Sequence, residues 1–245
     1  MKVGREELER LMNSDEPVSY ASFVSAIFDL YGQRKGKSLV GDKTASYMLN
    51  IPTLHGLWPQ AKFVHIIRDG RDVCLSMVNG KKAHVAAGRL STWTEDPLLT
   101  AALWWKHRVR HGREDGGALR PGLHYEIRYE TPRLSTGYRV RGAVRLPGPA
   151  LPRRDAEILR RAGEGGSQPQ RKKSVAPRHP GLRDGRSQMT LDDVERFEAA
   201  AGDLLDELGY PRAVPNPPQE KLRNATRIHH AFTQEIRTKR LPEHW

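Results

Sequence analysis

The segment of residues 62–76 constrains the fold of this chain more than any other part of the sequence. Residues 63–67 read Phe-Val-His-Ile-Ile, an apolar run with one histidine that is typical of a strand in a parallel sheet. Arg68 follows directly, at the carboxyl end, where open α/β sheets bind their ligands. The next two residues, Asp-Gly, predict a tight turn into a helix that contains Ser76. We therefore expect a strand–turn–helix unit with an arginine at its functional edge.

Strand and helix patterns alternate along most of the chain. Apolar residues at three- and four-residue spacing predict helices, and short apolar or alternating runs predict strands. The expected helices cover residues 18–32, 47–57 with a bend near Pro52, 98–109 and 190–208, and the expected strands cover residues 38–41, 63–67 and 123–129. This order predicts an α/β fold with a parallel sheet, right-handed crossovers and flanking helices. We expect one domain over residues 1–210 and a peripheral tail over residues 211–245, helical over 223–239.

The positive charge of the chain is concentrated in one segment. The net charge is +12, and residues 131–188 contribute +10 of it through 12 Arg and 2 Lys against four acids. This segment also contains eight Gly, seven Pro and a single aromatic residue, Tyr138, so it lacks the apolar area that an ordered core needs. We expect an irregular or disordered insert. The alternative is a protein that binds nucleic acid or another polyanion through these arginines, but the interleaved aromatics that usually grip nucleic-acid strands are missing.

Several protein classes are excluded by the composition. The lone cysteine, Cys74, excludes a disulfide framework and a cysteine-built zinc site, and we predict no metal site. No stretch approaches the ~18 uninterrupted apolar residues of a membrane span. The chain begins with a charged helical pattern and no apolar signal region. We therefore expect a soluble, cytoplasmic protein without a membrane span.

The residue types around Arg68 suit a doubly charged phosphate. An arginine, the Ser76 hydroxyl and the amino terminus of a helix together provide strong donors and positive charge. The alternative is structural: Arg68 pairs with Asp69 or Asp72, and Ser76 faces solvent. The spacing alone leaves both interpretations open.

Three stretches carry a family resemblance. They resemble the sulfotransferases that use 3′-phosphoadenosine-5′-phosphosulfate (PAPS). The stretches are residues 41–52, which contain Gly-Asp-Lys-Thr, residues 63–76, which contain Arg-Asp-Gly-Arg-Asp, and residues 125–130, which read Tyr-Glu-Ile-Arg-Tyr-Glu. The resemblance implies a P-loop-like α/β fold without a metal. It implies that Arg68 and Ser76 hold the 3′-phosphate of PAPS.

The resemblance also implies roles for three other cations. Lys43 would stabilise the charge that develops on the leaving group, and Arg183 and Arg186 would lie over the 3′-phosphate. The alternative for Lys43 is a surface lysine that pairs with Asp42. His65, within the apolar strand, and His55 are expected to be satisfied or packing histidines and not catalytic bases.

The chain departs from the family at its beginning. The apolar strand and the glycine-containing loop that wrap the 5′-phosphosulfate in this family are not found before Lys43. We therefore predict an N-terminally shortened, weakly active or inactive member that transfers a sulfuryl group to a hydroxyl or amine. The acceptor would be a small molecule or a glycan. Neither the acceptor nor the oligomeric state can be read from the sequence.

Overall fold

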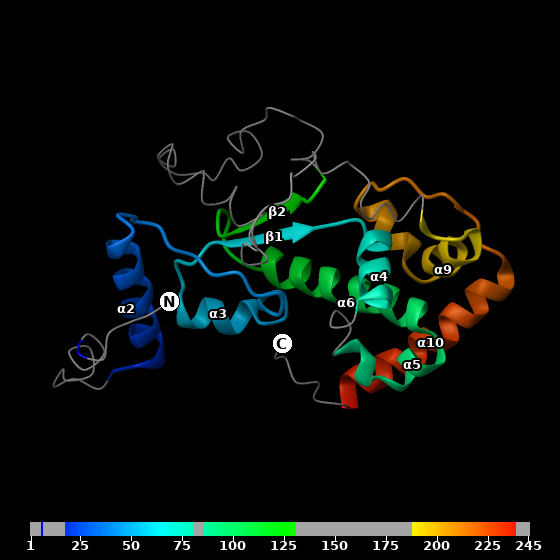
Figure 1. Ribbon diagram of the computed structural model, residues 1–245, viewed down its shortest axis with the longest axis horizontal. Helices are drawn as coiled ribbons and strands as arrows, with labels where there is room; N and C mark the ends of the chain where they lie inside the picture. The colour runs from blue at the N-terminus through cyan, green and yellow to red at the C-terminus, as the bar shows by residue number, and fades with distance from the viewer. Residues whose placement is uncertain (1–5, 7–17, 81–85, 131–187, 239–245) are drawn as a thin grey trace, which may run out of the picture.

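This computed structural model describes residue 6 and residues 18–80, 86–130 and 188–238. Within these residues, two parallel strands form the sheet. β1 (Phe63–Ile67) pairs with β2 (His124–Arg128) in a register that sets His65 opposite Glu126. Both strands were predicted from the sequence. The parallel pair and the helices around it are consistent with the predicted α/β class (Figure 1).

The third predicted strand, over residues 38–41, is wrong. These residues are irregular, and the side chain of Leu39 is 50% exposed. Four residues with a half-exposed leucine remove too little apolar surface from water to hold a strand against β1. The described part of the sheet is therefore only two strands wide.

Helix α6 (Pro97–Gly117) is the element around which the others pack. Its N-cap, Asp96, accepts a hydrogen bond of 3.0 Å from the N–H of Leu99, and a proline occupies the first turn, where no backbone donor is needed. The helix contacts the sheet, α4 (Gly70–Asn79) and α9 (Leu191–Glu207). The helix predicted over residues 98–109 is thus confirmed, and it is longer than predicted.

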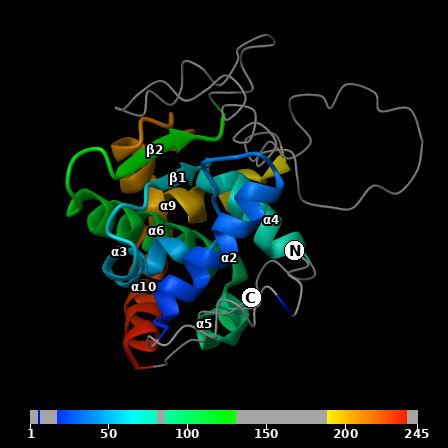
Figure 2. The ribbon, with the colours of Figure 1, turned by 90° about the vertical axis from the view of Figure 1, so that its left-hand side faces the viewer.

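The N-terminal part of the described chain contains a helix and a broken helical segment. α2 (Tyr20–Arg34) begins at Ser19, whose hydroxyl caps it with a hydrogen bond of 3.1 Å, and it lies at the end of the molecule opposite to α9 (Figure 1, Figure 2). The bent helix predicted over residues 47–57 is instead two elements, η1 (Tyr47–Leu49) and α3 (Ile51–Leu57). The reason is Pro52, which lies in the first turn of α3, because proline is tolerated at a helix start and not in a helix interior.

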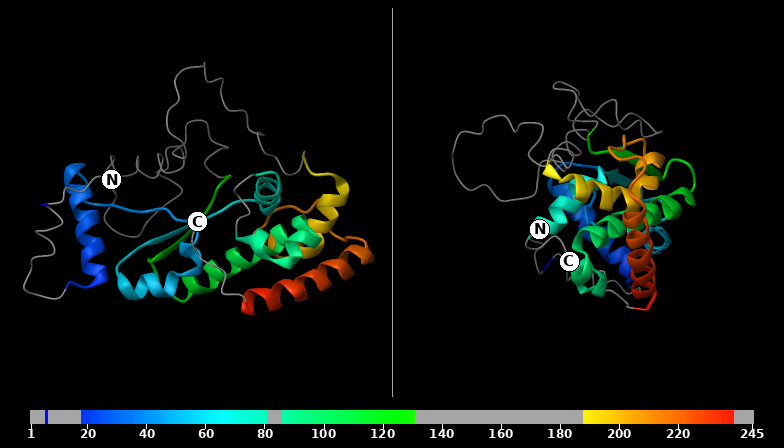
Figure 3. Two further views of the ribbon diagram at one scale, coloured as in Figure 1. Left: turned by 60° about the horizontal axis from the view of Figure 1, so that its bottom comes forward. Right: turned by 90° about the vertical axis from the view of Figure 1, so that its right-hand side faces the viewer.

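Helix α9, which was predicted over residues 190–208, is capped at both ends. Thr190 accepts a hydrogen bond of 3.1 Å from the N–H of Asp193 at the start of α9, and Gly209 follows its end with a φ of 66°, the left-handed conformation that favours glycine. α10 (Gln219–Thr238) then runs alongside α9 and α6 (Figure 3). Of the helices that the structure describes, none is long and apolar enough to cross a bilayer.

The apolar core joins segments that are far apart in the sequence. η2 (Ala87–Arg89) and α5 (Ser91–Glu95) pack near the start of α6. The fully buried side chains of the core come from four helices and include Cys74, Leu99, Phe197, Leu204 and Ile228, each 0% exposed. Ile228 lies in α10, so the segment that the sequence suggested to be a peripheral tail contributes to this core.

Gly70 is required by packing. It is the first residue of α4 and has no positive φ. A Cβ at this position would lie 2.6 Å from ring atoms of Trp105 and 2.8 Å from Phe197, closer than real contacts allow. The glycine therefore lets the start of α4 approach the core directly, and this approach fixes where the chain leaves β1.

Candidate functional site

Arg68 lies between the end of β1 and the start of α4. The indole N–H of Trp105 donates a hydrogen bond of 3.2 Å to the Arg68 carbonyl, which anchors the backbone. The guanidinium donates through Nε and Nη2 to Oδ2 of Asp72, at 3.0 and 2.5 Å. It also lies over the ring of Tyr129, 4.9 Å from the ring centroid. Arg68 is therefore held at the carboxyl end of the sheet, and its side chain is 23% exposed.

Asp72 and Ser76 follow Arg68 along α4. Arg68 precedes α4 and pairs with Asp72 in its first turn, and Ser76 is one turn further along the helix, so Asp72 and Ser76 lie on the same side of α4. Ser76 is half-buried. Of the two partners that the sequence offered for Arg68, the structure selects Asp72.

The amino terminus of α4 is occupied by the protein itself. The carboxylate of Asp69, the N-cap, accepts a hydrogen bond of 3.0 Å from the N–H of Arg71. The Asp69 N–H in turn donates to Oε1 of Glu130, at 2.8 Å. Two carboxylates therefore lie at this helix end, and Asp69 accepts the N–H of Arg71, one of the donors that the sequence analysis assigned to a phosphate.

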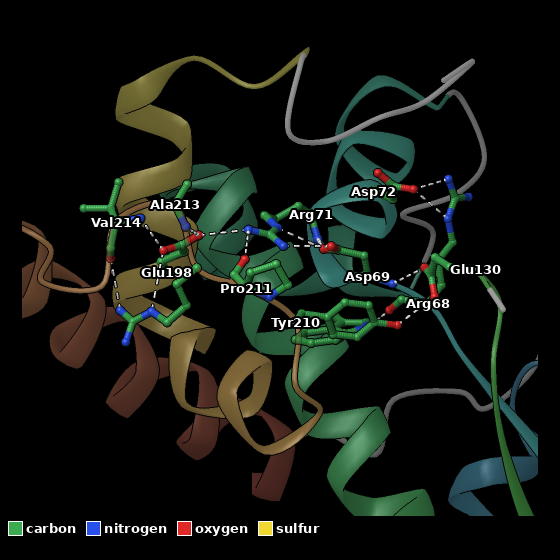
Figure 4. A network of polar contacts seen from close by, with 12 residues as sticks. Arg68, Asp69, Arg71, Asp72, Glu130, Glu198, Tyr210, Pro211, Ala213 and Val214 are labelled. Carbon is green, nitrogen blue, oxygen red and sulfur yellow. Dashed lines mark hydrogen bonds and ion pairs between the residues drawn. The ribbon is translucent and has the colours of Figure 1, made fainter. Parts of the chain in front are cut away.

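Asp69 belongs to a buried polar network (Figure 4). The Arg71 side chain, 1% exposed, bonds to both carboxylate oxygens of Asp69, at 3.0 and 2.8 Å, and to Oε1 of Glu198, at 3.0 Å. Glu198 also accepts the backbone N–H groups of Ala213 and Val214, at 2.9 and 2.8 Å. Burial on its own would lower the pKa of Arg71, but the contacts with Asp69 and Glu198 raise it overall, so the arginine stays charged.

Tyr210 extends the network to the end of β2. Its hydroxyl donates to Oε2 of Glu130, at 2.9 Å. Burial, followed by the hydrogen bond to Glu130, raises the pKa of Tyr210 well above its usual value. Glu130 thus connects the backbone at Asp69 with the segment after α9 and fixes the start of α4 from the other side.

The sequence did not reveal this network. Arg71 stands in the Arg-Asp-Gly-Arg-Asp motif, but its partner Glu198 lies 127 positions away. One signal for the network was available in the sequence. Glu198 stands at a buried position of the amphipathic pattern of α9, and a buried carboxylate requires a counter-charge.

The remaining predicted site residues lie elsewhere. Lys43 is exposed in an irregular segment, and the strand predicted just before it, over residues 38–41, is not formed. Asp42 accepts hydrogen bonds from the hydroxyls of Tyr47, at 2.5 Å, and Thr44, at 3.3 Å, and the described contacts include no pair between Asp42 and Lys43. Arg183 and Arg186 and the rest of the basic segment up to residue 187 lie outside the described residues.

Two cavities lie away from Arg68. One of about 320 Å³ lies between α6 and α10, and one of about 230 Å³ lies beside β2 and is lined in part by Arg113 and Glu126. Arg68 lines neither of these two cavities.

The chain matches one known family. A model of the sulfotransferase family matches residues 3–132, which include β1, α4, α6 and β2. Because the match spans more than half of the 245 residues, the chain belongs to the sulfotransferase family. No curated protein and no solved structure shows significant similarity to it.

Proposed function

We propose that this protein transfers a sulfuryl group from PAPS to a hydroxyl or amine of a small molecule or a glycan. The observation that carries the proposal is the position of Arg68, at the carboxyl end of β1 and the start of α4, inside the segment that matches the family. Ligands of α/β sheets bind at this edge. Arg68 and Ser76 would bind the 3′-phosphate of the donor.

The surroundings of Arg68 would allow a phosphate to replace Asp72 as the acceptor of its hydrogen bonds. Asp72 accepts hydrogen bonds from Nε and Nη2 of Arg68, and a doubly charged phosphate is a stronger acceptor for the same donors. The Tyr129 ring supports the planar guanidinium from one side. The Ser76 hydroxyl lies one helical turn beyond Asp72, where it can add a donor to the same phosphate.

Lys43 would act on the leaving group, and Arg183 and Arg186 would complete the binding of the 3′-phosphate. Sulfuryl transfer resembles phosphoryl transfer in that the protein mainly aligns the reactants and stabilises developing charge. Lys43 is exposed on an irregular segment, so its ammonium group is accessible to a ligand. The polyanion-binding alternative is supported only by the composition of residues 131–188, so we do not propose it.

Calorimetric titration with 3′-phosphoadenosine-5′-phosphate and with ADP tests the proposal. We expect the wild-type protein to prefer the 3′-phosphorylated nucleotide and Arg68→Ala to weaken its binding about ten- to a hundredfold, the range for losing a charged hydrogen bond. Arg223→Ala, which removes an exposed arginine of α10, is the matched control and should bind normally. Equal affinity for both nucleotides in the wild type, or full affinity in a folded Arg68→Ala protein, would overturn the proposal.

A turnover assay separates binding from chemistry. With PAPS and a panel of phenols, amines and sugars, Lys43→Ala should lower kcat while the affinity for 3′-phosphoadenosine-5′-phosphate stays unchanged. Reduced affinity with normal kcat would instead assign Lys43 to binding alone.

A further inference from the structure

Three potential metal ligands share one face of the sheet. The parallel register pairs His65 with Glu126 and Phe63 with His124, so the two histidines and Glu126 project from the same face. One ligand atom from each of the three side chains lies within 4.8 Å of the others. This cluster lies about 10 Å before Arg68 along β1, at ~3.3 Å per residue, and is separate from the proposed donor site.

His65 is buried and His124 is half-buried, and three of their ring nitrogens are buried without a hydrogen-bond partner among the described residues. His65 is 5% exposed, and neither of its ring nitrogens has a partner among the described residues. The same is true of Nε2 of His124. His65 is therefore a core histidine, as predicted, but among the described residues it has no hydrogen-bond partner. A buried polar group without a partner costs about 1–3 kcal/mol, so the arrangement calls for a ligand that uses these nitrogens.

Helix α6 makes room for both rings with two glycines. A Cβ at Gly112 would lie 3.0 Å from Cε1 of His65, and a Cβ at Gly116 would lie 2.4 Å from Nε2 of His124. The two glycines are one helical turn apart and face the sheet together. The rings are therefore seated against the backbone of α6, which restricts the directions in which their nitrogens can point.

We propose that His65, His124 and Glu126 bind a divalent transition-metal ion, with zinc as the best match and water as the fourth ligand. Two imidazoles and one carboxylate are a donor set that zinc accepts in tetrahedral sites. Zinc bonds of about 2.0–2.1 Å would bring the ligand atoms to ~3.3 Å from one another, so the side chains close inward when the ion binds.

Burial lowers the pKa of His65 to about 4 and also lowers that of His124, so both rings are neutral at pH 7 and offer a lone pair. Besides burial, two neighbouring charges act on the histidines in opposite directions, since Glu126 raises the pKa of both rings and Arg113 lowers it. Arg113 donates to Oε1 of Glu126, at 2.9 Å, which leaves Oε2 to face the metal. The positive charge of Arg113 is shared with a second carboxylate, Glu207, at 3.7 Å. Arg113 thereby orients the ligand from outside the metal site.

Titration of the full chain with zinc chloride, after dialysis against EDTA, tests this proposal by calorimetry and thermal melting. We expect one zinc ion per chain, a higher Tm with zinc, and visible absorption typical of a tetrahedral site with Co²⁺. Glu126→Gln, a nearly isosteric change at a side chain that is 35% exposed, should weaken zinc binding at least about tenfold and abolish the Co²⁺ signature. His124→Ala should act in the same direction.

Two control variants make the test specific. Glu220→Gln makes the same chemical change at an exposed carboxylate in the first turn of α10, and His111→Ala removes a histidine on the exposed side of α6. Both should bind zinc as the wild type does. Absence of zinc binding in the wild type, or binding that Glu126→Gln leaves intact, would overturn the proposal and assign the buried nitrogens to water. The readouts do not involve PAPS, so the proposed function can fail or succeed independently.

Discussion

Arg71 and Glu198 form an ion pair of 3.0 Å across 127 positions of the sequence, and their side chains are 1% and 0% exposed. The pair joins the first turn of α4 to the middle of α9. Breaking a buried pair leaves an uncompensated charge in the interior, which costs far more than breaking an exposed one. This pair therefore sets the position of the segment that carries Arg68.

Removal of the Arg71 charge should destabilise the protein strongly. We expect Arg71→Met to lower the free energy of unfolding by about 3–5 kcal/mol, because Glu198 and Asp69 lose their buried counter-charge. Arg110→Ala is the control, since Arg110 pairs with exposed carboxylates of α9 and should cost less than about 1 kcal/mol. Urea denaturation measures both, and a similar loss in the two variants would contradict the prediction.

Gly70 should not tolerate even a methyl group. In Gly70→Ala the new Cβ would overlap the Trp105 ring, so we expect a loss of about 1–3 kcal/mol in the free energy of unfolding. Gly56→Ala provides the matched change, because Gly56 lies in α3 with open space around its Cα. That variant should be neutral or up to about 1 kcal/mol more stable. If Gly70→Ala were as stable as Gly56→Ala, the close packing at the start of α4 would not be required.

Local sequence patterns were sufficient to predict most elements of the described fold. The apolar run at residues 63–67 and the periodicity of residues 98–109 correspond to β1 and α6, since each pattern matches the burial of its own segment. Residues 38–41 have a similar local pattern but gain no partner strand. Whether a short apolar run becomes a strand depends on a neighbour that the local sequence does not specify.

The contacts of the candidate site were less predictable for the same reason. The sequence offered Asp69 and Asp72 as alternative partners for Arg68, and the choice depends on Arg71, which binds Asp69 and leaves Asp72 for Arg68. The partner of Arg71, Glu198, comes from a distant helix. Such long-range polar contacts arise from tertiary packing and have no local signature.

Asp72 should compete with the proposed ligand for Arg68. Asp72→Asn removes a negative charge next to the guanidinium, so we expect 3′-phosphoadenosine-5′-phosphate to bind severalfold more tightly, equivalent to about 1 kcal/mol. Calorimetry at constant salt measures the change. Weaker binding in this variant would show that Asp72 instead positions Arg68 for the phosphate.

Tyr210 should make stability depend on alkaline pH. At pH 7, Tyr210→Phe should cost about 1–2 kcal/mol, because Glu130 loses a buried hydrogen bond. The pKa of Tyr210 is raised in the folded state, so above pH 10 the unfolded chain releases this proton first and wild-type stability falls. The difference between the wild type and Tyr210→Phe should therefore shrink as the pH rises from 10 to 11.

Urea denaturation at pH 7, 10 and 11 measures this difference. Tyr31→Phe, which removes an exposed hydroxyl on α2, should leave the free energy of unfolding at pH 7 unchanged. A gap between the wild type and Tyr210→Phe that stays constant across the three pH values would contradict the role of the Tyr210 proton.

The packing of α10 has a consequence for how this protein can be divided. The match to the sulfotransferase family ends at residue 132, yet Ile228 and Phe232 lie in the same core as Leu99 and Trp104. A fragment cut at the end of the match would leave one side of α6 as a bare apolar surface in water. The segment that matches the family is therefore shorter than the segment that forms the core. Experiments on the proposed donor site should use a chain that includes α10.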